Sequence, residues 1–191
     1  MKNFLFFFFL PIFLLANQKN QELCITNIEK INDKYIITFN DAIVVKDIKV
    51  IKAKDKYEIY LPFYITDNGK KYQQVSILDK NLYKKILDAV IYDKVEKNYI
   101  RNNPKFRINK FYENEFSDSK IKVFASVIFG ESLEIECKIL QTKYGLLIIW
   151  PSKKENNSWI SIIDFRSQKY KEKIERELLS RYKVHIIEFG K

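Results

Sequence analysis

The stretch Leu133-Glu-Ile-Glu-Cys-Lys-Ile139 alternates apolar and polar side chains, which is the period of two that a half-buried β-strand requires. Tyr35-Ile-Ile-Thr-Phe39 likewise predicts a strand with one apolar face, and Tyr72 to Ile77 and Trp159 to Ile163 are also predicted to be strands. Leu146-Leu-Ile-Ile-Trp150 is apolar on both faces and predicts a central, covered strand. Asp67-Asn-Gly69 predicts a hairpin turn, because Asn and Gly accept positive φ angles without a steric penalty. Together these patterns predict antiparallel β-sheets.

Two helices are predicted to cover these sheets. In both helical segments apolar residues recur every four positions, which is the spacing of one helix face. Asp79 and Ser167 stand where an N-cap residue is expected. The apolar stripes are Leu82, Ile86 and Val90 in the first segment, and Tyr170, Ile174, Leu178 and Tyr182 in the second.

The same order of strands, turns and helix occurs twice, first from Tyr35 to Val95 and again from Ile121. A polar linker at Tyr99 to Pro104 separates the copies. We therefore predict an α+β protein of two tandem repeats, residues 24–100 and 105–184, each a mainly antiparallel β-sheet followed by a C-terminal α-helix. A tail, residues 185–191, follows, in which His185 is expected to be a packed or edge-strand residue. The matched positions are Pro62 and Pro151, Lys49 and Lys138, Ile59 and Ile148, and Ile86 and Ile174.

Residues 1–16 have the composition of a secretory signal peptide. Lys2 is their only charge, and the thirteen residues from Phe4 to Ala16 are apolar. A membrane span needs about 17 to 25 apolar residues, so this run is short for a permanent anchor. We expect the chain to be exported to the periplasm or cell envelope. A short uncleaved membrane anchor and a cytoplasmic chain are the alternatives.

Charge and composition restrict the function classes. The 191 residues carry 34 Lys and Arg against 24 Asp and Glu, and the net charge of +10 favours acidic partners. The four glycines are scattered, which excludes the glycine-rich loops that bind phosphates. One histidine and two distant cysteines, Cys24 and Cys137, form no metal or catalytic motif. We predict no enzymatic activity, cofactor, metal or small-molecule substrate. The thiols are expected to be buried and free, with a disulfide in an oxidising compartment as the alternative.

Three segments carry the pattern of a known family. Gly145-Leu-Leu-Ile-Ile-Trp-Pro-Ser-Lys-Lys154 resembles the G-L-F-I-A-M-P-S-K-R stretch of the septation protein SpoVG (stage V sporulation protein G) family of small bacterial regulators. Ile43-Val-Val-Lys-Asp-Ile-Lys-Val-Ile51 resembles that family's F-V-V-H-D-I-R-V-I strand. Lys85-Ile-Leu-Asp-Ala-Val-Ile91 resembles K-I-Q-D-A-V-L, the start of its C-terminal helix. The first copy departs from the pattern, because Pro62-Phe-Tyr64 replaces Pro-Ser-Lys.

The resemblance implies a regulator of septation, cell division and sporulation that binds DNA or RNA. Family members are normally single-repeat, cytoplasmic and dimeric, so two fused copies would pair as a pseudo-dimer within a monomeric chain. A basic loop and one flank of the second helix would then contact phosphates. The candidate residues are Lys153, Lys154, Arg166, Lys169, Lys173 and Arg176, with Lys70, Lys71, Lys84 and Lys85 as the first-copy analogue.

Two alternatives stay open. The second helix has three pairs of opposite charges at a spacing of four, which is also typical of an ordinary solvated face. These pairs are Glu172 with Arg176, Lys173 with Glu177, and Lys171 with Glu175. If the chain is exported, it is a non-catalytic binding module of the envelope whose basic surface meets an anionic polymer, a lipid or a protein.

Overall fold

The computed structural model describes residues 22–66, 68–97, 99, 102–116 and 118–189. The predicted leader, residues 1–16, lies outside the described residues. The first half comprises β1 (Ile25–Ile31), β2 (Lys34–Phe39), β3 (Ile43–Ala53), β4 (Lys56–Tyr60), β5 (Phe63–Ile65), β6 (Lys71–Gln73), β7 (Val75–Ile77) and α1 (Lys80–Tyr92). The second half comprises β8 (Phe106–Glu113), β9 (Ile121–Phe129), β10 (Leu133–Thr142), β11 (Gly145–Ile149), β12 (Ser152–Glu155), β13 (Ser158–Ser161), β14 (Ile163–Phe165) and α2 (Gln168–Phe189). The predicted α+β class with mainly antiparallel sheets is confirmed.

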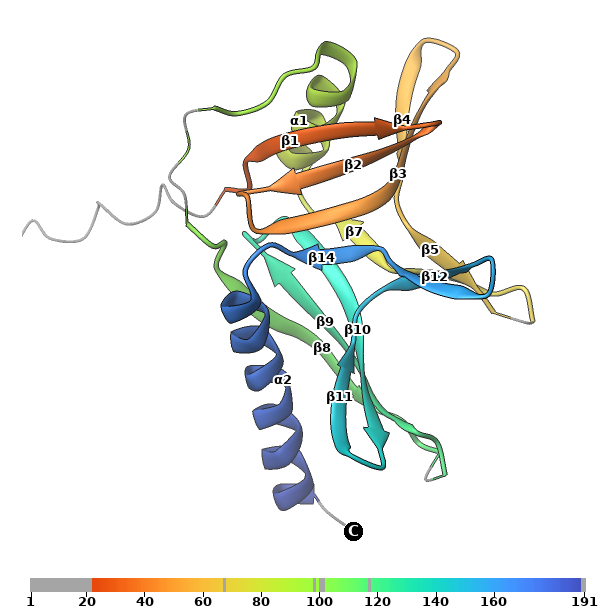
Figure 1. Cartoon of the computed structure of the whole chain (residues 1–191), viewed down its shortest axis with the longest axis vertical. Helices are drawn as coiled ribbons and strands as arrows, with labels where there is room; N and C mark the ends of the chain where they lie inside the picture. Colours follow the sequence, from red (N-terminus) through yellow and green to blue (C-terminus); the bar gives the residue numbers. More distant parts are fainter. Residues whose placement is uncertain (1–21, 67, 98, 100–101, 117, 190–191) are drawn as a thin grey trace, which may run out of the picture.

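Each half contributes one short strand to the sheet of the other half (Figure 1). One sheet has the order β1-β2-β3-β14, with β4 also paired to β3. The other has the order β11-β10-β9-β8, with β7 also paired to β10. The pairs β5–β6 and β12–β13 form separate hairpins. The two sheets are therefore joined by exchanged strands.

The two exchanges have the same register. Phe165 of β14 pairs with Ile43, the first residue of β3, and Ile77 of β7 pairs with Leu133, the first residue of β10. The turns that precede β3 and β10 also match, since Asn40 and Asp41 have φ angles of 53° and 50°, and Gly130 and Glu131 have φ angles of 52° and 57°. These left-handed angles suit Gly, Asn and Asp.

A single cluster of buried side chains extends through both halves. Phe39 and Val45 from the first sheet, Val75 from an exchanged strand and Ile135 from the second sheet have no exposed surface. Residues of both helices join this cluster. The core therefore forms only when both halves are folded together.

The predicted helix features are confirmed. The Asp79 carboxylate accepts a hydrogen bond from the Leu82 backbone N–H at 3.3 Å, and the Ser167 hydroxyl accepts one from the Tyr170 N–H at 3.2 Å. Both are N-caps. The Tyr170 ring packs edge-on against Phe106 at 6.0 Å between centroids. Neither described helix combines the length and the apolar character that a membrane span requires.

Three expectations were wrong in detail. The stretch from Leu146 to Trp150 was predicted to be a central strand, but β11 is an edge strand that pairs only with the far end of β10, so Leu147 is half exposed. The predicted strands Tyr72–Ile77 and Trp159–Ile163 are each divided in two. The second part of each, which lies in β7 or β14, pairs with the sheet of the other half. Residues 185–189 continue α2, so the backbone at His185 is helical and not part of an edge strand.

Candidate nucleic-acid interface

Eight of the candidate basic residues fall into two groups. Lys70, Lys71, Lys153 and Lys154 lie on or beside the two hairpins, β5–β6 and β12–β13. Arg166, Lys169, Lys173 and Arg176 lie just before α2 or on it. Figure 1 shows the β12–β13 hairpin and α2 on opposite sides of the molecule, so the loop and the helix flank do not form one continuous face.

The β5–β6 hairpin carries aromatic rings covered by lysines. Tyr64 and Tyr72 are cross-strand partners, and their rings stack with centroids 5.2 Å apart and planes 11° apart. Lys70 Nζ lies 4.9 Å from the centroid of the Tyr72 ring, and Lys71 Nζ lies 3.9 Å from that of Phe63. A hydrogen bond to Tyr72 raises the pKa of Lys70. Both ammonium groups therefore contact aromatic faces.

Lys138 of β10 joins this hairpin and was not among the candidates from the sequence. Its Nζ lies 4.9 Å from the Tyr64 ring centroid and 5.6 Å from that of Phe124. Burial lowers the pKa of Lys138, against the opposing charge of Glu136. The sequence analysis matched Lys138 with Lys49, but the alternation of β10 does not show that the β5–β6 hairpin lies against the Lys138 side chain.

On the second hairpin, Lys153 is neutralised and Lys154 is not. Lys153 Nζ lies 2.6 Å from Asp47 Oδ1 and 2.6 Å from Glu155 Oε1. Burial opposes its charged form, but the hydrogen bonds that its ammonium group donates to these carboxylates outweigh burial and raise the pKa of Lys153. Lys154 is exposed and lies opposite Trp159 in the hairpin. Lys154 is therefore the lysine of this hairpin that is free to meet a ligand.

The charges of α2 are less paired than their spacing suggests. Of the three predicted pairs, only Lys171 with Glu175, at 3.8 Å, is an ion pair among the described residues. Glu172 instead accepts a hydrogen bond from the Gln168 amide at 3.1 Å. Lys173 lies over the Phe106 ring at 5.7 Å. Lys169, Lys173 and Arg176 are exposed, which leaves them accessible to an anion.

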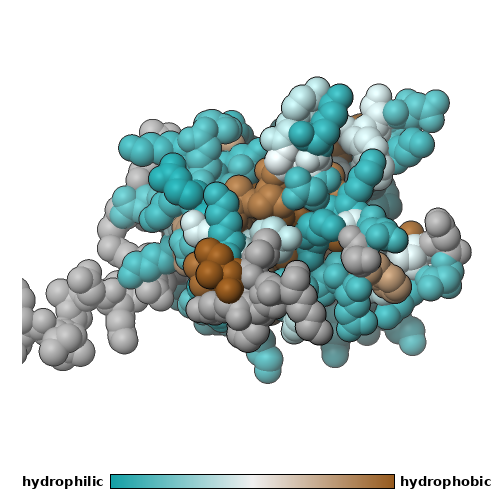
Figure 2. Space-filling model, turned by 90° about the horizontal axis from the view of Figure 1, so that it is seen from below, coloured by the Kyte–Doolittle hydropathy of each residue, from teal (hydrophilic) through white to brown (hydrophobic). Residues whose placement is uncertain are grey.

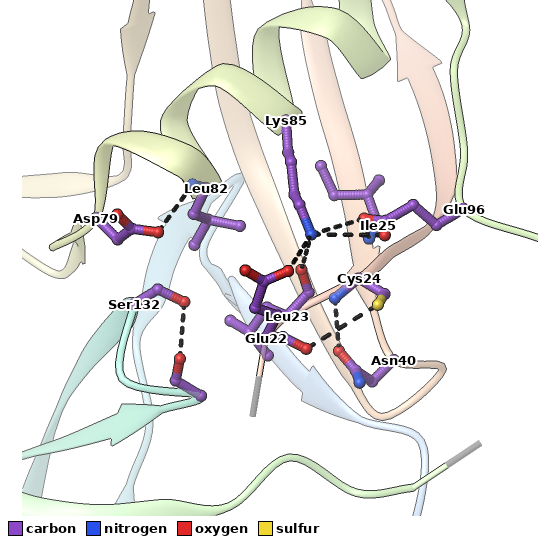
Figure 3. A network of polar contacts seen from close by, with 11 residues as sticks. Glu22, Leu23, Cys24, Ile25, Asn40, Asp79, Leu82, Lys85, Glu96 and Ser132 are labelled. Carbon is purple, nitrogen blue, oxygen red and sulfur yellow. Dashed lines mark hydrogen bonds and ion pairs between the residues drawn. The ribbon is translucent and has the colours of Figure 1, made fainter. Parts of the chain in front are cut away.

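Lys85, named with Lys84 as part of the weaker first-copy analogue, has an internal role. Figure 3 shows its ammonium group between the segment just before β1 and the segment after α1. Lys85 Nζ lies 3.3 Å from Glu22 Oε2, 3.3 Å from the Leu23 carbonyl oxygen and 3.3 Å from Glu96 Oε1. Lys85 therefore binds its own chain, whereas Lys84 is exposed.

A buried carboxylate on the second sheet has three partners within its own half. Glu134 Oε1 accepts hydrogen bonds from the Ser126 hydroxyl at 2.6 Å and the Asn109 amide at 2.9 Å, and Lys110 Nζ lies 3.4 Å away. Burial raises its pKa, but these partners outweigh burial and lower the pKa of Glu134. These contacts connect β8, β9 and β10 and account structurally for a buried charge.

No group of His, Cys, Asp and Glu side chains in the described ranges has the arrangement of a metal site. Cys24 and Cys137 are both free thiols, the first half-buried and the second buried. Comparison of the chain with protein-family models, curated proteins and solved structures gave no match.

Proposed function

We propose that this chain is a SpoVG-like regulatory protein of the septation and sporulation type that binds nucleic acid without catalysing a reaction. Its two halves are diverged copies of one unit, paired within one chain as a pseudo-dimer. The reciprocal strand exchange supports the duplication, because Val45 pairs with Ile163 just as Ile135 pairs with Val75. Such an exchange pairs backbone groups at sheet edges that could otherwise pair with another chain.

The placement of lysines beside aromatic rings on both hairpins carries the binding proposal. Lys70 and Lys71 lie over Tyr72 and Phe63, and Lys154 lies opposite the exposed ring of Trp159. Lysines neutralise phosphates and release counterions, while aromatic faces stack on bases. No carboxylate forms an ion pair with these three lysines in the part of the chain that the structure describes.

Binding to labelled single-stranded and duplex oligonucleotides over a range of salt concentrations tests the proposal. In a Lys70→Glu/Lys71→Glu/Lys154→Glu variant, affinity should fall and the slope of log affinity against log salt should decrease by about 2. Lys52→Glu/Lys56→Glu/Lys80→Glu is the matched control, since it changes the net charge equally at other exposed sites. Equal loss in both variants would leave only non-specific attraction and contradict the hairpin interface.

The helix group needs a separate variant because it lies apart from the hairpins. Lys169→Glu/Lys173→Glu/Arg176→Glu removes three exposed cations from the first half of α2 without touching its buried stripe. If this variant alone loses binding, the interface is the helix flank and the hairpin assignment is wrong.

The apolar leader favours a second candidate, an exported envelope module that uses the same basic surface. Phe4 to Ala16 has the length of a signal-peptide core. Cell fractionation with N-terminal sequencing separates the two functions. A mature N-terminus near Asn17 in the exported fraction would exclude direct gene regulation, whereas an intact cytoplasmic chain would exclude the envelope module.

A further inference from the structure

The most exposed apolar side chains of the molecule gather at one end. In the described residues, Tyr144, Ile187 and Phe116 are the three most exposed large apolar or aromatic side chains, with 88%, 83% and 76% of their surface accessible. They come from the β10–β11 turn, the last turn of α2 and the β8–β9 connection. Figure 1 shows these three segments together at the lower end of the molecule.

Further exposed apolar residues extend this end. Tyr112 lies near the end of β8, Leu147 in β11 and Val184 in α2, and each exposes half of its surface or more. Figure 2 views the molecule from this side and shows apolar surface, in brown, as separate patches among white and teal residues, one of them near the centre. We name this surface the distal face, defined by Tyr112, Phe116, Tyr144, Leu147, Val184 and Ile187.

Lysines adjoin the apolar residues of the distal face. Lys143 adjoins Tyr144 and lies 4.8 Å over its ring, and Lys183 adjoins Val184. In the described part of these segments, five cations stand against four carboxylates, a small positive excess. The cations are Lys120, Lys122, Lys143, Arg181 and Lys183, and the carboxylates are Glu113, Glu115, Asp118 and Glu188.

We propose that the distal face docks on an anionic phospholipid bilayer. Tyrosine and other aromatic rings prefer the zone between lipid headgroups and acyl chains, where an apolar ring and a polar tip are both satisfied. Neighbouring lysines extend their ammonium groups to the headgroups and add attraction to anionic lipid. Three separate chain segments end at the same end of the molecule, so exposed apolar side chains of all three can contact one surface. This docking is independent of the nucleic-acid proposal, which uses other residues.

A local probe tests the docking in the full chain, where the leader is present in every sample. The variant Cys24→Ser/Tyr144→Cys places an environment-sensitive fluorophore on the distal face, and Cys24→Ser/Tyr57→Cys places it on β4 as a control. Cys137 stays unlabelled, because burial raises the pKa of its thiol to about 12. With equimolar phosphatidylglycerol and phosphatidylcholine vesicles, the emission at position 144 should rise and shift to the blue while that at position 57 is unchanged. No change at position 144, or an equal change at both, overturns the proposal.

Vesicle sedimentation then measures the contribution of the rings. Tyr112→Ser/Phe116→Ser/Tyr144→Ser should weaken binding to these vesicles about tenfold, whereas Tyr57→Ser/Tyr60→Ser/Trp159→Ser, which removes three exposed rings elsewhere, should not. Equal effects of the two variants overturn the proposal. So does a chain that is dimeric without vesicles and becomes monomeric in the distal-face variant, since a second copy would then cover this surface.

Discussion

Lys153 Nζ lies 2.6 Å from Asp47 Oδ1, although 106 residues separate them in the chain. Asp47 sits at an irregularity of β3, where the pairing register with β2 shifts and the residue has a φ of 67°. Lys34 Nζ lies 2.7 Å from the same oxygen. The hairpin of the second half is thereby tied to the sheet of the first half at a β-bulge.

Replacing Asp47 by Asn should destabilise the protein at neutral pH. Burial alone would raise the pKa of Asp47, but the hydrogen bonds from Lys153 and Lys34 outweigh burial and lower it. Loss of the partly exposed pairs should cost about 1 kcal/mol, or a fall in Tm of about 2 to 4 °C. Asp55→Asn, in the exposed β3–β4 turn, is the control and should leave Tm unchanged.

The effect of Asp47 should depend on pH in one direction. Because its pKa is lower in the folded than in the unfolded chain, its stabilisation is complete above the unfolded value of about 3.9 and is lost as the pH falls through the folded value. The Tm difference between wild type and Asp47→Asn should therefore shrink below about pH 4. A difference that persists at pH 2 would refute the ion-pair explanation.

Replacing Lys85 by Met should loosen the start of β1. Glu96 also accepts a hydrogen bond from the Ile25 N–H at 3.3 Å, so the ammonium group organises both sides of this junction (Figure 3). Burial opposes the charge, but Glu96 and Glu22 outweigh burial and raise the pKa of Lys85. Its stabilisation is therefore complete below about pH 10 and is lost at higher pH. Hydrogen exchange of residues 23–28 should accelerate, whereas the exposed-site control Lys84→Met should not alter it.

Neither half should fold alone. A fragment of residues 22–97 keeps β7 but lacks β14, and a fragment of residues 102–189 lacks β7, so each loses a strand and part of the shared core. Circular dichroism should show unfolded fragments, a mixture should regain sheet structure, and the whole chain should unfold in one transition. A fragment that folds by itself with slow hydrogen exchange would contradict this interdependence.

If the two halves are paired copies, as proposed, the full chain should be a monomer in solution, since the pairing that a dimer would supply would be made within one chain. Light scattering after size exclusion should give a mass near 23.0 kDa for the chain, less the leader if it is cleaved. A stable dimer at micromolar concentration would count against the pseudo-dimer.

The two thiols should react at different rates. Cys137 is buried, and burial raises its pKa to about 12, so alkylation at pH 8 should follow global unfolding. Burial and the charge of Glu96 also raise the pKa of Cys24, but this residue is half-buried and should react first. Mass spectrometry after timed alkylation distinguishes the sites, and equal rates would contradict the packing around Cys137.

Local sequence patterns predicted the elements well. The alternation of β10, the apolar spacing of both helices and the caps Asp79 and Ser167 all depend on residues within a few positions of one another. The basic residues of the candidate interface could be located on loops and helix flanks for the same reason. Their grouping could not, because the distance between β12 and α2 depends on the path of the chain between them (Figure 1).

By itself, the sequence determined the α+β class, the order of most elements and the charge of the surface, since periodicity and capping are short-range. Only the tertiary structure decided that β7 and β14 cross to the opposite sheet, that Lys153 pairs with Asp47 and that Lys138 lies under Tyr64. Each of these pairings joins residues far apart in the chain. The free energy that stabilises these pairings comes from the burial of apolar side chains and from hydrogen bonds, and both form only when the two halves share one core.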